Sequence, residues 1–152
     1  MLFRTNCTEQ TEAIGERLAT ALIKNKSRAF IAMRGEMGVG KTAFTRGFAR
    51  ALGISGVKSP TYTIVNEHRG EHKLFHYDMY RLGDEDDLYS TGYDDYLMQD
   101  GFIVAEWSER LPDSIPRDAI YVTISRTPED EGARDILIEF PNTEDENVYS
   151  GI

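Results

Sequence analysis

Residues 35 to 42 read Gly35-Glu36-Met37-Gly38-Val39-Gly40-Lys41-Thr42 and match the pattern G-x-x-x-x-G-K-[ST] of a phosphate-binding loop, or P-loop. Glycines let such a loop turn with its N–H groups pointing inward and no Cβ in the way. The apolar run Ala29–Met33 before the loop predicts a short buried strand. The pattern from Lys41 to Leu52 predicts a helix, which Gly53 is placed to end. A strand, a glycine loop and a helix in this order predict a binding site for a polyphosphate.

Two residues at the end of this loop would carry the chemistry of the site. We expect Lys41 to bridge the β- and γ-phosphates of a nucleoside triphosphate, and the Thr42 hydroxyl to be a ligand of Mg²⁺. The alternative is a glycine-rich turn that binds nothing. Such a turn has no need of Lys and Thr after its last glycine, so the sequence favours the nucleotide site.

The composition of the chain narrows the class of protein and its partners. A lone cysteine, Cys7, cannot form an internal disulfide, and no apolar run of about 18 residues occurs, so we expect a cytoplasmic protein. The formal net charge is −9, and the sequence has no obvious basic face. A protein that binds nucleic acid alone needs such a face, so any contact with nucleic acid is expected through another subunit.

Apolar patterns along the chain predict an α/β fold, a P-loop NTPase-like mixed β-sheet flanked by helices, with antiparallel hairpins. We expect residues 1–140 to form a single P-loop ATPase domain, and the acidic residues 141–152 to be a poorly ordered tail. Besides the elements around the loop, the sequence predicts helices over 8–22, 84–88 and 94–99 and strands over 62–68, 73–77, 101–105, 119–125 and 135–140.

Two acidic residues follow apolar runs and are candidates for holding Mg²⁺ from the side opposite the loop. Asp78 follows Leu74–Tyr77, and Glu106 follows Phe102–Ala105. Open α/β sheets bind ligands beyond the carboxyl ends of their strands. Each of the two could instead be a solvated strand end. Thr61, in a hydroxyl-rich segment, could contact a γ-phosphate as a switch residue or could be an ordinary turn residue.

Aromatic and histidine residues near these positions allow more than one interpretation. Trp107 could shield the metal site from water, bind a partner or cover the core. Tyrosines and carboxylates gather between residues 77 and 100, as either a partner surface or two amphipathic helices with core tyrosines. His68, His72 and His76 recur every four residues but cross a predicted hairpin, so we do not expect them to bind a metal together.

Four motifs in this order resemble the TsaE family, formerly called YjeE: GEMGVGKT (35–42), SPTYTIV (59–65), FHYDMYRL (75–82) and VAEW (104–107). The resemblance extends from about Thr11 to Arg134. It implies a bacterial ATPase that acts with the proteins TsaB and TsaD, which attach a threonylcarbamoyl group to adenosine 37 of tRNAs reading ANN codons. In that family, ATP hydrolysis is thought to reset the TsaB–TsaD complex between turnovers.

The resemblance also implies roles for residues of this sequence. Residues 37–42 (Met37, Gly38, Val39, Gly40, Lys41 and Thr42) would bind the phosphates of ATP, with Thr42 and Glu106 as Mg²⁺ ligands. Asp78 would assist the metal or the attacking water, Thr61 would act as the switch, and Trp107 would lie beside the metal. Thr11 matches a position that lines the adenine, and Arg134 matches a polar neighbour of the nucleotide. Met37 and Val39 differ from many relatives, at variable positions of the loop.

Other functions use the same loop. A small-molecule or nucleotide kinase would transfer the γ-phosphate to a second substrate and usually needs an arginine-rich lid, whereas arginines are scattered in this sequence. A GTPase would need an N-K-x-D segment, which the sequence lacks. A non-enzymatic module, in which ATP only controls partner binding, stays open. No arginine near the four motifs is an evident finger, so we expect slow hydrolysis by the isolated chain.

Overall fold

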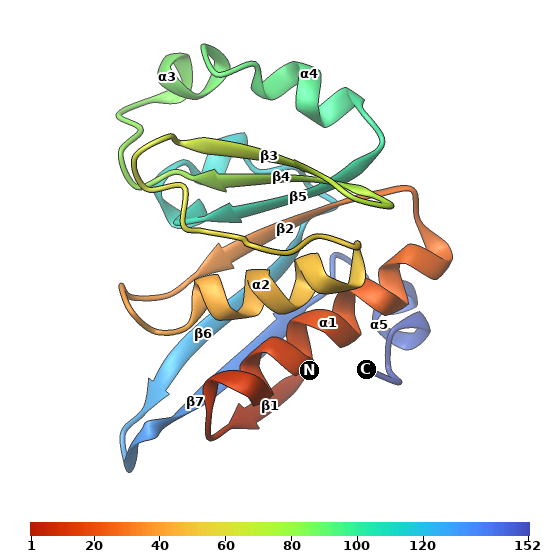
Figure 1. Ribbon diagram of the computed structural model, residues 1–152, viewed down its shortest axis with the longest axis vertical. Helices are drawn as coiled ribbons and strands as arrows, with labels where there is room; N and C mark the ends of the chain where they lie inside the picture. Colours follow the sequence, from red (N-terminus) through yellow and green to blue (C-terminus); the bar gives the residue numbers. More distant parts are fainter.

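The computed structural model describes residues 1–152, which form one seven-stranded mixed sheet with helices on both faces (Figure 1). No helix is long and apolar enough to cross a membrane. The elements in chain order are β1 Leu2–Thr5, α1 Thr8–Asn25, β2 Arg28–Arg34, α2 Lys41–Ala51, β3 Val65–Arg69, β4 Lys73–Asp78, α3 Glu85–Tyr89, α4 Tyr93–Met98, β5 Gly101–Glu106, β6 Ile120–Thr127, β7 Asp130–Glu139 and α5 Thr143–Val148, with short 3-10 turns at Ser108–Arg110 and Pro112–Ser114.

The sheet has a parallel centre and antiparallel sides. Its strand order is β1-β7-β6-β2-β5-β4-β3. Strand β2 pairs in parallel with β5 and β6, and β4 pairs in parallel with β5. The hairpins β3–β4 and β6–β7 are antiparallel, as is the pair β1–β7. This arrangement confirms the predicted mixed sheet with antiparallel hairpins.

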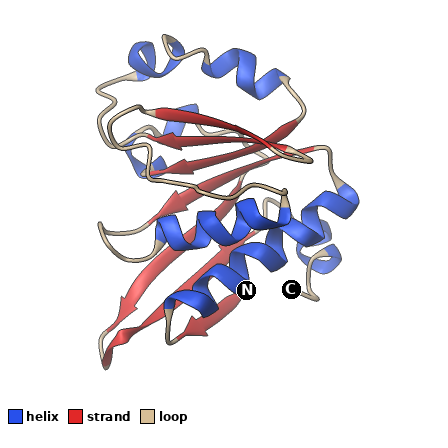
Figure 2. Cartoon of the chain, in the orientation of Figure 1, coloured by secondary structure: helices blue, strands red, loops and turns tan.

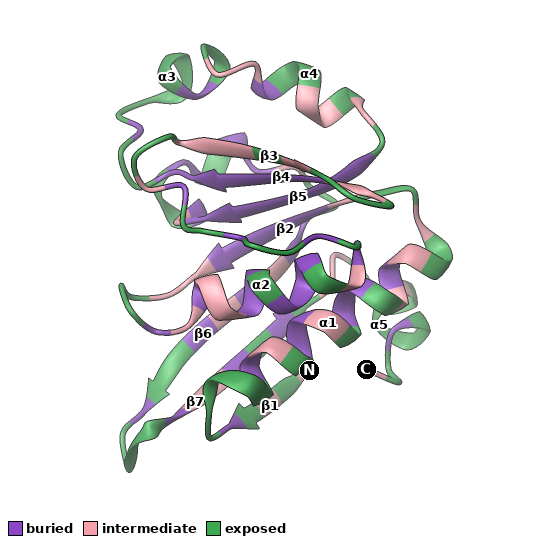
Figure 3. Ribbon diagram, in the orientation of Figure 1, coloured by how far each residue is buried: buried purple, intermediate pink, exposed green.

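Two hydrophobic cores lie on opposite faces of the sheet, because successive side chains of a strand alternate. On one face, Ile31, Met33 and Val104 pack with α1 and α2; on the other, Ala32 and Ile103 pack with α3 and α4. Figure 2 shows the two groups of helices separated by the strands. Strands β4 and β5 are buried along almost their whole length (Figure 3). Their carboxyl ends are therefore held in fixed positions.

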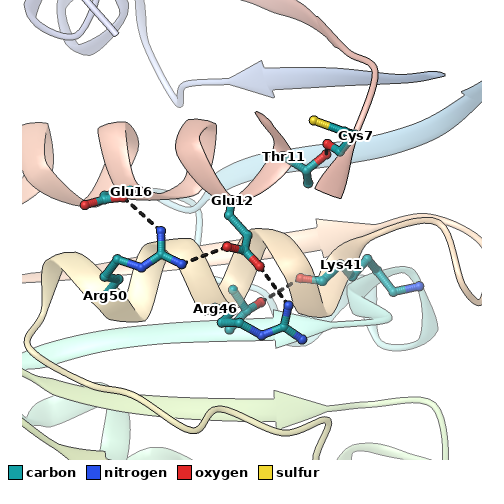
Figure 4. A network of polar contacts seen from close by, with 8 residues as sticks. Cys7, Thr11, Glu12, Glu16, Lys41, Arg46 and Arg50 are labelled. Carbon is teal, nitrogen blue, oxygen red and sulfur yellow. Dashed lines mark hydrogen bonds and ion pairs between the residues drawn. The ribbon is translucent and has the colours of Figure 1, made fainter. Parts of the chain in front are cut away.

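Helices α1 and α2 approach each other closely at two glycines. A Cβ added to Gly15 would lie 2.2 Å from the carbonyl oxygen of Phe44, and one added to Gly47 would lie 1.8 Å from that of Glu12. Arg46 and Arg50 of α2 also donate hydrogen bonds to Glu12 of α1, at 2.8 and 2.7 Å (Figure 4). Only glycine permits this contact, which places the first turn of α1 beside the P-loop.

The fold differs from the sequence prediction at both ends. The prediction missed β1, which pairs with β7 at the edge of the sheet. The tail was expected to be poorly ordered, but Asn142 caps helix α5 through a hydrogen bond from Asp145 N. Tyr149 is buried and stacks on Phe140, with ring centroids 5.2 Å apart. The cap, the buried Tyr149 and an ion pair between Asp145 and Lys26 hold a segment that its acidic composition predicted to fray.

The first hairpin begins later than predicted. Residues 61–63 form a turn, and β3 starts only at Val65. Ile64, just before it, has a positive φ of 70°, which a β-branched residue rarely adopts. The Thr61 segment is therefore a separate loop beside the sheet, not the first part of a strand.

Candidate active site

The P-loop joins β2 to α2 through glycines in backbone conformations that other residues rarely adopt. Gly38 and Gly40 have φ angles of 74° and 121°, and Lys41 is the first residue of α2. Adding a Cβ at Gly35, with φ 146°, would bring it 2.5 Å from the carbonyl oxygen of Ile124. The loop can thus turn its N–H groups inward at the positive end of the α2 dipole, which favours an anion.

Lys41 lies largely buried at the centre of the loop. Its Nζ atom donates hydrogen bonds to the carbonyl oxygens of Gly35 and Glu36, and lies 4.1 Å from the ring centroid of Trp107. Burial lowers the pKa of Lys41, and the nearby carboxylates, Glu106 first, oppose that shift. The direct contacts of Nζ are neutral groups, and no carboxylate forms an ion pair with it, so an anionic ligand could still bind to this positive charge.

One cavity of about 330 Å³ gathers most of the predicted site residues. Its lining comprises Met37, Gly38, Gly40, Lys41, Thr42, Ala43, Ser59, Thr61, Asp78, Tyr80, Glu106 and Trp107. Val39 is the one residue of 37–42 that does not line this cavity. It is 2% exposed, and its side chain packs in the core with α1 and α2. Only the backbone of Val39 is available to a ligand.

Asp78 and Glu106 lie side by side because they occupy paired positions at the ends of two parallel strands. Each is 4% exposed. Asp78 Oδ1 accepts a hydrogen bond from Tyr80 N at 2.9 Å, and Glu106 Oε2 accepts one from His76 Nε2 at 2.6 Å. No three His, Cys, Asp or Glu side chains gather to hold a metal on their own. Mg²⁺ usually needs only one or two protein carboxylates, with phosphate and water completing its shell.

The Thr61 loop closes one side of this cavity. The Thr61 hydroxyl is 2.7 Å from that of Ser59. The carbonyl oxygens of Thr61 and Tyr62 both accept hydrogen bonds from Arg81 Nη1, at 3.2 Å each. Tyr62 is 90% exposed, so its side chain adds no contact with the segment after Asp78. Arg81 is therefore the main side-chain contact between this loop and the segment after Asp78.

Trp107 forms the opposite wall in a left-handed backbone conformation, with φ 57°. Its ring lies between Lys41 Nζ and the ring of Tyr80, whose centroid is 5.0 Å away. The next residue, Ser108, donates a hydrogen bond to the carbonyl oxygen of Met33 at 3.0 Å, which anchors the turn to β2. The tryptophan is thus part of the cavity wall as well as a cover for the core.

A second cavity, of about 170 Å³, lies on the other side of the P-loop. Gly38, Gly40 and Ala43 line both cavities, and the second is completed by Cys7, Thr8, Thr11, Val39, Gly132 and Arg134. Thr11 is 3% exposed and its hydroxyl lies 2.9 Å from that of Thr5. Arg134 Nε donates to the carbonyl oxygen of Val39 at 2.9 Å. The structure thus separates Thr11 and Arg134 from the two carboxylates.

Sequence reasoning missed two residues at this site. His76 was considered only as a metal ligand with two other histidines, although it alternates with Asp78 on β4 and therefore shares its face. Arg126, at the end of β6, places Nη2 3.7 Å from where a Cβ on Gly38 would lie. Arg134 was the arginine expected near the nucleotide; no local motif marks Arg126, because β6 follows the loop by about 80 residues.

The tyrosines between residues 77 and 96 divide between core and surface. Tyr77 and Tyr93 are fully buried, in edge-to-face contact with centroids 5.6 Å apart, and burial raises the pKa of both. Tyr80 and Tyr89 are 43% and 44% exposed. The core explanation therefore accounts for Tyr77 and Tyr93, while Tyr80 belongs to the cavity wall.

Comparisons with known proteins point to one family. Residues 5–136 match the sequence model of the family described as "Threonylcarbamoyl adenosine biosynthesis protein TsaE". The tRNA threonylcarbamoyladenosine biosynthesis protein TsaE of Bacillus subtilis is 37% identical over 85% of this chain and 80% of its own. The protein of the same name from Haemophilus influenzae is 38% identical over 72% of both chains. The crystal structure of Bacillus subtilis YdiB superposes with a TM-score of 0.80, at 28% identity, over 99% of this chain and 91% of that one.

Proposed function

The chain belongs to the TsaE family, and from that premise we propose that it is a Mg²⁺-dependent ATP hydrolase acting in the threonylcarbamoyl modification of tRNA. The observation that carries the proposal is the single cavity in which Lys41 and Thr42 of the P-loop face Asp78 and Glu106 at the strand ends. A phosphate cradle opposite buried carboxylates is the arrangement that phosphoryl transfer to water requires.

The residues present fit a magnesium–nucleotide complex. The loop glycines and the α2 N-terminus would hold the phosphates, and Lys41 would exchange the carbonyl oxygens of Gly35 and Glu36 for phosphate oxygens. Thr42 and Glu106 would be the protein ligands of Mg²⁺, which when bound neutralises charge on the phosphates. Asp78, held by Tyr80 N, would orient the metal's water or the attacking water.

Four further residues would complete the ATP site. Thr11 and Arg134 line the cavity on the other side of the P-loop and would contact the nucleoside part of ATP. Thr61 would sense the γ-phosphate, because it lines the cavity with Lys41 and Thr42 and lies in a turn outside the sheet, next to the exposed Tyr62. Trp107 would limit the access of water beside the metal.

We propose TsaB and TsaD as partners, with tRNA bound through them and not by this chain alone. The net charge of −9 supports indirect contact with tRNA, because direct binding of phosphates requires a positive surface. Hydrolysis of ATP would reset the partner complex between rounds of modification. For the isolated chain we expect a rate below roughly 1 per second, because transition-state charge is stabilised only when a finger or partner is in place.

The test is a reconstituted modification reaction with TsaB, TsaD, tRNA and a threonylcarbamoyl donor. With Mg²⁺ and ATP, we expect the wild-type chain to raise the number of tRNAs modified per TsaD well above one. With Glu106→Ala, or with a non-hydrolysable ATP analogue, each TsaD should modify only about one tRNA. A yield that does not depend on this chain would refute the proposed role, and transfer of the γ-phosphate to another molecule instead of water would favour a kinase.

A further inference from the structure

We propose that His76 is a positioning residue that fixes the Glu106 carboxylate for Mg²⁺; the inference rests on the proposed function. His76 lies on β4, two residues before Asp78, and its side chain is fully buried. Its Nε2 atom is 2.6 Å from Glu106 Oε2 on the neighbouring strand β5. It is the one hydrogen bond between the Glu106 side chain and another residue.

The hydrogen bonding of His76 determines which nitrogen carries the proton. An ionised carboxylate only accepts, so Nε2 must be the donor. The other ring nitrogen, Nδ1, is buried and has no partner. A hydrogen on Nδ1 would be a buried donor without an acceptor, which is costly, so the geometry favours the hydrogen on Nε2, where Glu106 accepts it. An apolar residue would fill the position without an orphan nitrogen, so packing alone does not explain the histidine.

The contact has a direct consequence for the carboxylate. Oε2 of Glu106 is engaged by His76, and Oε1 accepts no hydrogen bond from the protein while the residue lines the cavity with Thr42 and Lys41. One oxygen is therefore anchored and the other is left for a ligand. When a residue that hydrogen-bonds to a metal ligand is removed, the affinity for the metal typically falls about 10- to 100-fold.

The experiment compares metal binding with nucleotide binding. Wild type and variants are titrated with Mn²⁺ in the presence of a non-hydrolysable ATP analogue, with free Mn²⁺ followed by electron paramagnetic resonance. The affinity for the analogue is measured separately in EDTA. For His76→Leu we expect Mn²⁺ binding about 10- to 100-fold weaker, with the EDTA affinity within about two-fold of wild type. A purely structural role would weaken both.

Further variants separate the hydrogen bond from packing. His76→Gln places an amide N–H near the Nε2 position and should restore most of the Mn²⁺ affinity, whereas His76→Asn carries the same amide on a shorter stem and should behave like His76→Leu. This pair decides the question even if the Leu variant does not fold. His68→Leu is the matched control, because His68 lies on the same hairpin and its Nε2 has no partner; we expect it to bind Mn²⁺ like wild type.

The possible failures can be told apart. Wild-type Mn²⁺ affinity in His76→Leu, or equal affinities in the Gln and Asn variants, would overturn the role of His76 and leave the ATPase proposal intact. Absence of analogue binding, or of analogue-dependent Mn²⁺ binding, in the wild-type chain would overturn the proposed function and this inference with it.

Discussion

The two sides of the P-loop are built from different kinds of structure. On the side of Glu106 and Asp78, the polar groups stand at the ends of buried parallel strands, and backbone pairing sets their spacing. On the side of Thr11 and Arg134, they come from the start of a helix and from an outer hairpin, and tertiary packing sets their spacing. We infer that the first side is specialised for chemistry, which demands a fixed geometry, and the second for affinity.

Lys41→Ala should have the largest effect on ATP binding, because Lys41 would bind the phosphates, which lie between the two sides. Charged hydrogen bonds contribute about 1.5–3 kcal/mol each, so the loss of two predicts ATP binding weaker by on the order of 1000-fold. Isothermal titration calorimetry measures this affinity. Lys24→Ala, at an exposed position in the last turn of α1, is the control. Equal affinities in the two variants would mean that the loop is not the phosphate site.

Glu106→Ala should affect only the side with the carboxylates. ATP binding without Mg²⁺ should persist, and phosphate release with Mg²⁺ should fall about 100-fold, because a metal contributes several kcal/mol to the transition state. A coupled phosphate assay gives the rate. The control is Glu139→Ala, which removes an exposed carboxylate from β7. Wild-type turnover in Glu106→Ala would remove Glu106 from the site.

Gly47→Ala should disturb the opposite side through packing. The new Cβ would lie 1.8 Å from the carbonyl oxygen of Glu12, so α1 must move away from α2. We expect the free energy of unfolding to fall by about 1–3 kcal/mol or more, the usual cost of overpacking, as measured by urea denaturation. Gly151→Ala is the control, because a Cβ there meets nothing within 4 Å. An unchanged free energy of unfolding would show that the two helices can separate enough to accept the added methyl group.

Arg134→Ala should have the smallest effect. It removes the hydrogen bond to the carbonyl oxygen of Val39, worth about 1 kcal/mol, two hydrogen bonds to the carbonyl oxygens of Glu131 and Ala133, and one polar neighbour of the second cavity. We expect ATP affinity to fall about five-fold while the rate at saturating ATP is unchanged. Arg117→Ala, at an exposed position before β6, serves for comparison. A lower saturating rate would place Arg134 in the chemistry and weaken the division between the two sides.

The sequence was sufficient for the parts of the fold that local patterns determine. The P-loop, β2, α2 and β5 each follow from a continuous motif or apolar run, and Asp78 and Glu106 follow from their places after such runs. The contact between His76 and Glu106 could not be predicted, because it depends on the register of β4 against β5 across about 30 residues. Arg126 reaches the loop only because β6 pairs with β2. The roles of all the site residues stay predictions.

The short edge strand β1 and helix α5 were missed for a different reason. Strand β1 has four residues, and its Leu2 is 68% exposed, so it carries no clear alternation. Helix α5 is held by the buried Tyr149 and by an ion pair between Asp145 and Lys26, just after α1, two separate contacts in an acidic segment. Both elements form through contacts with residues distant in the sequence. Strand β1, for example, pairs with residues of β7 that lie more than 100 positions away.

The backbone contact of Gly15 and Gly47 also restricts where the molecule can change shape. Helices this close, and tied by Glu12 to two arginines, are expected to move together. Residues 61–63, beside the cavity, form a turn whose Tyr62 faces solvent, so a ligand in the cavity could rearrange this turn without moving the helix pair. We therefore expect a partner that distinguishes the bound from the empty state to contact this turn, since the helix pair would look the same to it in both.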